Sequence, residues 1–89
     1  MEEIADEAIV EKFGIAIRLV KDSGTYIVKQ APIDQEGKYN ENEFRVFGGP
    51  VDYDSSEFDN EEDAQKFFND IQILSEKQLI KRYPKIWAL

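Results

Sequence analysis

The richest source of chemistry in this 89-residue chain is an acidic stretch, residues 51–65, which reads VDYDSSEFDNEEDAQ. No Lys or Arg stands between Arg45 and Lys66. Closely spaced carboxylates can act as a general acid and base, hold a hard cation such as Ca²⁺, or pair with the Arg and Lys side chains of a partner. The first two uses make further demands on the residues around the carboxylates.

Calcium binding is disfavoured by the positions that an EF-hand loop fixes. Asp52 and Asp54 stand where the first two ligands of such a loop would stand. The sixth position then needs Gly for a sharp turn and the twelfth needs a bidentate Glu, but these positions hold Glu57 and Asp63. The sequence therefore predicts no metal site.

Catalysis is disfavoured by the residue types that the chain lacks. It has no Cys and no His, which removes thiol nucleophiles, imidazole acid/base steps and most transition-metal sites. A pair such as Asp52 and Asp54 would need an apolar setting to raise one carboxyl pKa, and only Val51 and Tyr53 supply it. We therefore predict a protein that is not an enzyme, with no catalytic residue and no cofactor.

Residues 59–74 carry the pattern of a main amphipathic helix. Asp59 and Glu62 have capping-box spacing, with Asn60 as a competing N-cap. The apolar stripe that follows repeats at helical intervals: Ala64, Phe67, Phe68, Ile71 and Leu74. Ser75 and Gln78 form a second possible capping box, which predicts a short C-terminal helix.

The first half of the chain is predicted to form a short helix and three strands. Residues 2–12 have Ile4, Ala8 and Ile9 on one side of a helix, with acids early in it. Residues 13–21 and 25–30 alternate around Asp-Ser-Gly, so they read as a hairpin in which Gly24 has a positive φ. After a long connection over 31–42, residues 43–49 read as the third strand.

Together these elements predict one domain, 1–89, of the α+β class. Its two layers are a three-stranded antiparallel sheet and helices, namely the N-terminal helix, the 59–74 helix and the short C-terminal helix. The only Trp, near the C-terminus, is predicted to plug the core. The rest of the predicted core comprises Ile15, Ile17, Leu19, Tyr26, Val28, Phe44, Val46, Phe67, Phe68, Ile71 and Leu74.

The formal net charge of −8 limits the partners. Attraction to nucleic acid or to an anionic membrane is disfavoured at long range. One basic cluster stands near the end, and it is small beside the acidic body: Lys77, Lys81, Arg82 and Lys85. The apolar runs are too short to span a bilayer, and the acidic start does not resemble a signal peptide. We expect a cytoplasmic monomer or weak dimer that binds neither nucleic acid nor membrane directly.

The acids of the 51–65 stretch divide into two groups. Glu61, Glu62 and Asp63 are explained by the positive end of the helix dipole. Asp52, Asp54 and Glu57 precede the helix and have no such explanation. In an extended segment Asp52 and Asp54 project to one side about 6.6–6.8 Å apart, a sparse imitation of a line of DNA phosphates, which follow one another at about 3.4 Å along each strand. Clustered like charges repel one another, which costs stability. Two explanations therefore stay open: the run has a function, or it only keeps the protein soluble.

Residues 57–79, EFDNEEDAQKFFNDIQILSEKQL, together with the predicted order of elements, resemble the small acidic phage-encoded anti-CRISPR proteins that inhibit an RNA-guided nuclease. The resemblance implies that acidic side chains mimic DNA and occupy an Arg-rich pocket. The matching partner-binding candidates in this chain are Asp52, Asp54, Glu57 and Asp59, with Glu61 and Glu62 behind them.

The functional prediction is therefore a small acidic binding protein. In its most specific form it is a phage or mobile-element inhibitor that mimics nucleic-acid charge. Its partner would be a protein with a basic surface, such as one that handles nucleic acid. The alternative is an interaction or accessory domain that uses its sheet face, an edge strand or the C-terminal tail RYPKIWAL.

Overall fold

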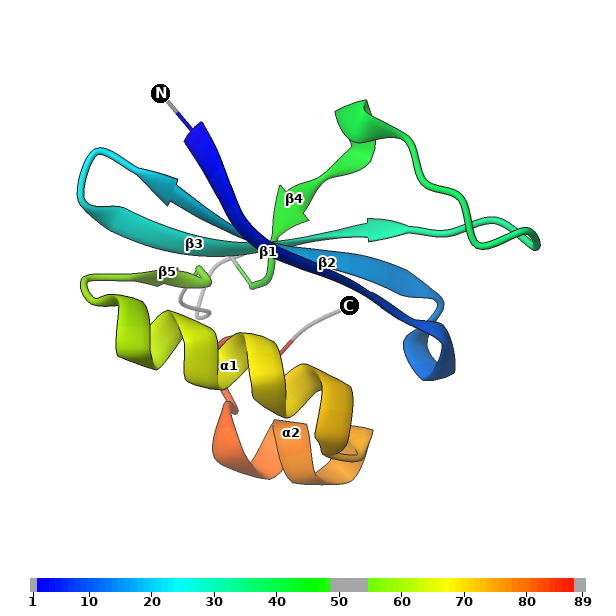
Figure 1. The fold of residues 1–89 in the computed structure, drawn as a ribbon. Helices are drawn as coiled ribbons and strands as arrows, with labels where there is room; N and C mark the ends of the chain where they lie inside the picture. Colours follow the sequence, from blue (N-terminus) through cyan, green and yellow to red (C-terminus); the bar gives the residue numbers. More distant parts are fainter. Residues whose placement is uncertain (1, 49–54, 88–89) are drawn as a thin grey trace.

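The computed structural model describes residues 2–48 and 55–87. In these residues one antiparallel sheet is followed by two helices (Figure 1). The elements are β1 (Glu2–Val10), η1 (Glu11–Phe13), β2 (Ile15–Asp22), β3 (Thr25–Pro32), η2 (Glu41–Glu43), β4 (Arg45–Val46), β5 (Glu57–Phe58), α1 (Glu61–Ile73) and α2 (Glu76–Arg82). Figure 1 shows both helices on the same side of the sheet, so the predicted α+β class is correct.

The predicted N-terminal helix is wrong, because residues 2–10 form the strand β1. This strand pairs antiparallel with β2, from Glu2 opposite Asp22 to Val10 opposite Ile15. The helical spacing of Ile4, Ala8 and Ile9 competes with a tertiary requirement. β2 is buried along most of its length, so its backbone needs a pairing partner on the side away from β3. Neighbouring strands routinely override local propensity in this way.

β1 is the outer strand of the sheet, and its edge is modified in two ways. The register shifts between Ile4 and Asp6, which is a β-bulge. The carboxylate of Asp6 accepts a hydrogen bond from the backbone N–H of Glu7 at 2.8 Å. Bulges and covered backbone donors both hinder the addition of another strand to an edge. A partner that approaches β1 therefore meets side chains more readily than free backbone.

The hairpin of β2 and β3 is confirmed. Its eight cross-strand pairs run from Asp22 opposite Thr25 to Ile15 opposite Pro32. Ser23 and Gly24 both have positive φ, at 51° and 85°, as a two-residue type I′ turn requires.

The prediction of a three-stranded sheet is also wrong, because two short strands share the far side of β3. β4 pairs with Lys29 and Gln30, and β5 pairs with Tyr26 and Ile27. Ser56 joins this region to β3. Its backbone carbonyl accepts from the N–H of Val28 at 3.0 Å, and its own N–H donates to the carbonyl of Phe47 at 3.1 Å.

The two helices begin where side chains cap them. Asn60, not Asp59, is the N-cap of α1, and its side chain accepts from the N–H of Asp63 at 2.8 Å. The main amphipathic helix is otherwise confirmed. The predicted capping box of Ser75 and Gln78 starts α2, with both reciprocal hydrogen bonds present. None of the helices in the described segments is long and apolar enough to cross a membrane.

The core lies between the sheet and the helices and closes on Trp87, which is 6% exposed, as predicted. The ring centroid of Trp87 lies 5.1 Å from that of Phe13 and 5.3 Å from that of Phe47. The predicted residues in the buried cluster are Ile15, Ile17, Leu19, Val28, Phe67, Phe68 and Ile71, and Tyr26 and Leu74 pack against it half-buried.

The predicted inward register of residues 43–49 is wrong. Phe47 is the fully buried residue of this segment, while Phe44 and Val46 are half-buried. Alternation over seven residues favoured Phe44 and Val46, but the strand spans only two residues, so alternation does not extend to Phe47. The side-chain hydroxyl of Ser56 accepts from the Phe47 N–H at 2.9 Å and fixes that residue in the core.

Candidate partner-binding surface

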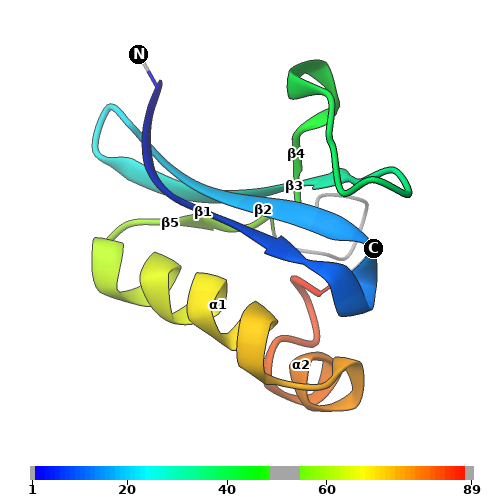
Figure 2. The same ribbon diagram turned by 45° about the vertical axis from the view of Figure 1, so that its right-hand side comes forward.

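Acidic residues from separate parts of the chain meet at one end of the molecule, which we call the acidic end. The register sets Glu2 opposite Asp22, and it sets Tyr26 of the next strand opposite Phe58. Figures 1 and 2 both show the start of β1, the β2–β3 turn, β5 and the start of α1 on the same side of the molecule. The acidic end comprises Glu2, Glu3, Asp22, Glu57, Asp59, Glu61 and Glu62.

The structure brings together four of the six predicted site residues. Glu57, Asp59, Glu61 and Glu62 are all exposed at the acidic end. Glu57 accepts a hydrogen bond from the hydroxyl of Ser55 at 2.6 Å. The other two predicted residues, Asp52 and Asp54, lie outside the described residues.

The sequence did not predict the contributions of β1 and β2 to the acidic end. The predicted helix over residues 2–12 explains the acidity of Glu2 and Glu3 by the helix dipole, but both residues lie in β1. Asp22 is predicted only as part of the turn, and it is the last residue of β2. The predicted hairpin could have indicated this arrangement. A strand that precedes β2 and pairs antiparallel with it must start next to the β2–β3 turn.

Some of these acids are neutralised locally and some are not. Lys29 pairs with Glu2 at 2.6 Å. Four exposed acids of the acidic end form no hydrogen bond or ion pair through their side chains to the described residues: Glu3, Asp59, Glu61 and Glu62. These four carboxylates are available to an external cation.

Basic residues gather toward the far end of α1. Lys12 donates to the last carbonyls of that helix, at 2.6 Å to Leu74 and 3.3 Å to Gln72. α2 and the segment after it contribute Lys77, Lys81, Arg82 and Lys85. The molecule is therefore electrically polarised along α1, in the same direction that the helix dipole favours.

The sheet face opposite the helices holds a nearly buried cation. Arg18 is 8% exposed and stands directly opposite Glu7 on β1, with its Nε 3.1 Å from that carboxylate. Its two terminal nitrogens bond the carboxylate of Glu41 at 2.8 and 2.9 Å. The guanidinium carbon lies 4.1 Å from the ring centroid of Phe44. These contacts attach the 39–44 segment to the sheet.

Hydrogen bonding in this cluster shifts several pKa values. The bonds to Glu41 raise the pKa of Arg18, and the same contact lowers the pKa of Glu41 below its ordinary value. The pKa of Tyr39 is raised, first because its hydroxyl donates to Glu7. At the C-terminal end of α2, burial raises the pKa of Tyr83, and its hydrogen bond to Asp70 adds to that effect.

The lowered pKa of Glu41 makes a pH-dependent prediction. The folded state binds the Glu41 proton more weakly than the unfolded chain, so this charge stabilises the fold above its ordinary pKa of 4.5. That stabilisation is lost as pH falls through the lowered pKa. We expect the difference in unfolding free energy between wild type and Glu41→Gln to be largest near neutral pH and to shrink as the pH falls below 4.5.

Urea denaturation across this pH range measures the effect. Glu43→Gln is the matched control, since Glu43 is exposed in the same turn and bonds no cation of the described residues. Its difference from wild type should stay nearly constant. An equal difference at both ends of the range for Glu41→Gln would contradict the assigned role of the Arg18 contact.

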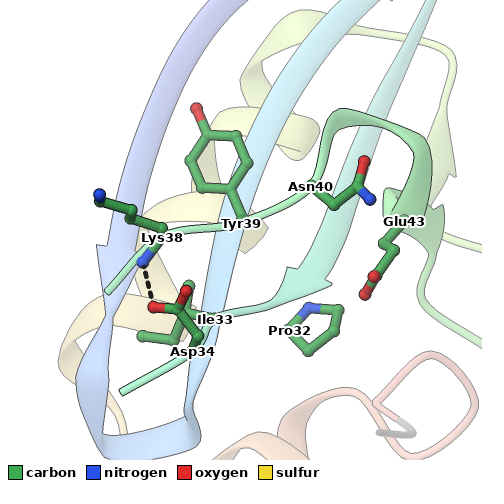
Figure 3. A pocket seen from close by; sticks show the side chains of 7 residues that line it. All are labelled: Pro32, Ile33, Asp34, Lys38, Tyr39, Asn40 and Glu43. Carbon is green, nitrogen blue, oxygen red and sulfur yellow. Dashed lines mark hydrogen bonds between the residues drawn. The ribbon is translucent and has the colours of Figure 1, made fainter. Parts of the chain in front are cut away.

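A shallow pocket of about 360 Å³ lies beside this segment (Figure 3). Its main carboxylate, Asp34, is occupied in closing the loop, because it accepts from the N–H groups of Glu36 and Lys38 at 2.8 and 2.9 Å. Figure 3 shows the hydroxyl of Tyr39 pointing away from Asp34 and Pro32. The carboxylate of Asp34 is therefore occupied by hydrogen bonds within its own turn.

Among the described residues, no group of three acidic side chains is arranged to hold a metal ion. Comparisons with protein-family models, with curated proteins and with solved structures gave no match. The acidic end is the candidate site that follows from the geometry.

Proposed function

We propose that this protein is a small non-enzymatic binding protein whose acidic end engages a basic surface of a partner protein. The observation that carries the proposal is the convergence of acids from β1, the β2–β3 turn, β5 and α1 on one side. Clustering like charges costs stability through mutual repulsion. A cationic partner surface relieves that repulsion and gains charge-assisted hydrogen bonds.

In its sharper form the proposal is charge mimicry of nucleic acid by a phage or mobile-element inhibitor acting in the cytoplasm. Acids of different strands, side by side, offer a charged surface to Arg and Lys that normally hold phosphates. The layout of the anti-CRISPR proteins that the sequence resembles begins with a helix, whereas this chain begins with β1. The proposal therefore rests on the placement of charge.

The experiment compares two variants that each lose three negative charges. The acidic-end variant is Glu3→Gln, Asp59→Asn and Glu62→Gln. The control variant is Glu11→Gln, Glu36→Gln and Glu43→Gln, which neutralises acids that are equally exposed but lie elsewhere. Each immobilised protein captures partners from host lysate at about 50 and about 500 mM NaCl, and bound proteins are then challenged with duplex DNA.

We expect wild type to retain a basic protein at low salt that both high salt and DNA release. Since exposed ion pairs contribute about 0.2–1 kcal/mol each, the acidic-end variant should bind about tenfold more weakly, while the control binds like wild type. Equal binding by the two variants, or retention that salt does not affect, would overturn the proposal. If salt releases the bound protein but DNA does not, the proposal of a basic partner stands and the proposal of nucleic-acid mimicry is rejected.

A third variant tests the segment that the sequence singled out: Asp52→Asn, Asp54→Asn and Glu57→Gln. If the partner contacts this segment as well as the acidic end, this variant should also lose binding. If it binds like wild type, the contact surface is limited to β1, Asp59 and the start of α1.

A further inference from the structure

α2 presents a basic and apolar side to solvent. Lys77, Ile80 and Lys81 follow one another at i, i+3 and i+4, so they share one side of the helix, away from buried Leu79. Ile80 is 50% exposed. Within the described residues neither Lys77 nor Lys81 has an ion-pair partner, although the chain carries nineteen acids.

Helix stability explains only part of this surface. Lys81 and Arg82 stand in the last turn, where the helix dipole favours cations. Lys77 stands in the first turn, where the dipole opposes a positive charge, and Ile80 gains nothing from exposure to water. These two residues are left without a structural explanation.

A surface hollow of about 380 Å³ lies next to this side, lined by Leu74, Gln78, Lys81 and Arg82. Half-buried Leu74 provides an apolar part of the wall. Arg82 is held at the rim by Asp70, 3.2 Å away. Lys81 borders both the hollow and the exposed side of α2. Figure 2 shows α2 at the far end of α1 from its start, so this surface is separate from the acidic end.

We infer that α2 and this hollow dock an acidic segment of a partner protein that carries an aliphatic anchor. Lys77 and Lys81 are one helical turn apart, with Cβ atoms about 5–6 Å from each other. Alternate side chains of an extended segment are about 6.6–6.8 Å apart on one side, so two acids at alternate positions match the two lysines. Because Lys81 also borders the hollow, we assign the aliphatic anchor to the position two residues before the acid that pairs with Lys81. The motif is aliphatic-x-acid-x-acid.

The proposal can be tested with a short synthetic peptide, Leu-Ser-Glu-Ser-Glu, acetylated and amidated at its ends. Titration into ¹⁵N-labelled full-length protein should shift backbone amide resonances of residues 74–82. Two control peptides each lack one part of the motif: Ser-Ser-Glu-Ser-Glu lacks the anchor and Leu-Ser-Gln-Ser-Gln lacks the charges. Each should bind at least about fivefold more weakly, since both terms contribute.

A pair of double variants tests the location. Lys77→Gln with Lys81→Gln should weaken peptide binding about tenfold, whereas Lys21→Gln with Lys66→Gln removes the same charge elsewhere and should leave it unchanged. The inference is overturned if no resonance of residues 74–82 moves, if the two double variants bind alike, or if the two control peptides bind as well as the first. It is equally overturned if the protein ignores the peptide but sediments with phosphatidylserine vesicles, because the surface would then be a membrane contact.

Discussion

Phe67→Ala is expected to lower the free energy of unfolding by about 3–5 kcal/mol. Phe67 is fully buried, and its ring centroid lies 5.3 Å from that of Phe47, 5.8 Å from Phe58 and 4.8 Å from Tyr83. These contacts join α1 to the segment before β5, to β5 itself and to the end of α2. Truncation to Ala therefore removes the ring that these three parts of the chain share and leaves a cavity between them.

Urea denaturation followed by circular dichroism measures this loss, and the same helix supplies a control. Ile73 on α1 is 73% exposed, so Ile73→Ala should change the unfolding free energy by less than about 0.5 kcal/mol. A loss below about 1 kcal/mol for Phe67→Ala would be incompatible with a filled core at that position.

Arg18→Met is expected to have the second-largest effect, a loss of about 2–3 kcal/mol. Breaking a buried ion pair by removing one partner costs about 3–5 kcal/mol, and the cost is smaller here because the Glu41 side chain is 67% exposed and regains water. The aliphatic part of Met keeps some packing, but Glu7 and Glu41 lose their shared cation. The 39–44 segment should then detach from the sheet.

Two comparisons separate charge from geometry. Lys21→Met removes an exposed cation of the same strand and should cost less than about 0.5 kcal/mol. Arg18→Lys keeps the charge but loses the bidentate geometry, so its stability should lie between wild type and Arg18→Met. Amide hydrogen exchange of residues 39–44 should rise in the Arg18 variants alone. Equal losses for Arg18→Met and Lys21→Met would show that the cluster adds no stability.

The features that the sequence predicted correctly depend on local signals. The Ser75–Gln78 capping box, the turn at Gly24 and the stripe of α1 each involve residues within a few positions of one another. Residues 2–10 carry no decisive local signal, because Ile4, Ala8 and Ile9 suit a helix or a half-exposed strand. Their structure is decided by β2, whose free edge could not be recognised until its own pairing with β3 was known.

The candidate site was half predictable for the same reason. Glu57, Asp59, Glu61 and Glu62 are close in sequence, so their proximity needed no tertiary information. Their meeting with Glu2, Glu3 and Asp22 depends on the pairing of β1 with β2 and of β5 with β3. The separate clustering of Lys77 and Lys81 was visible as a basic segment, but its exposed Ile80 required knowledge of which side of α2 is buried.

The order in which the strands pair also has a consequence for synthesis of the chain. β1, β2 and β3 are joined by consecutive hairpins, so most of the sheet needs only contacts between neighbours in sequence and can form early. Its apolar face, with Ile17, Leu19 and Val28, then stays uncovered until α1 leaves the ribosome. We expect the bulged, acid-lined edge of β1 to hinder edge-to-edge pairing of two nascent sheets during that interval. The outer edge of β3 gains its own cover only when β4 and β5 have been made.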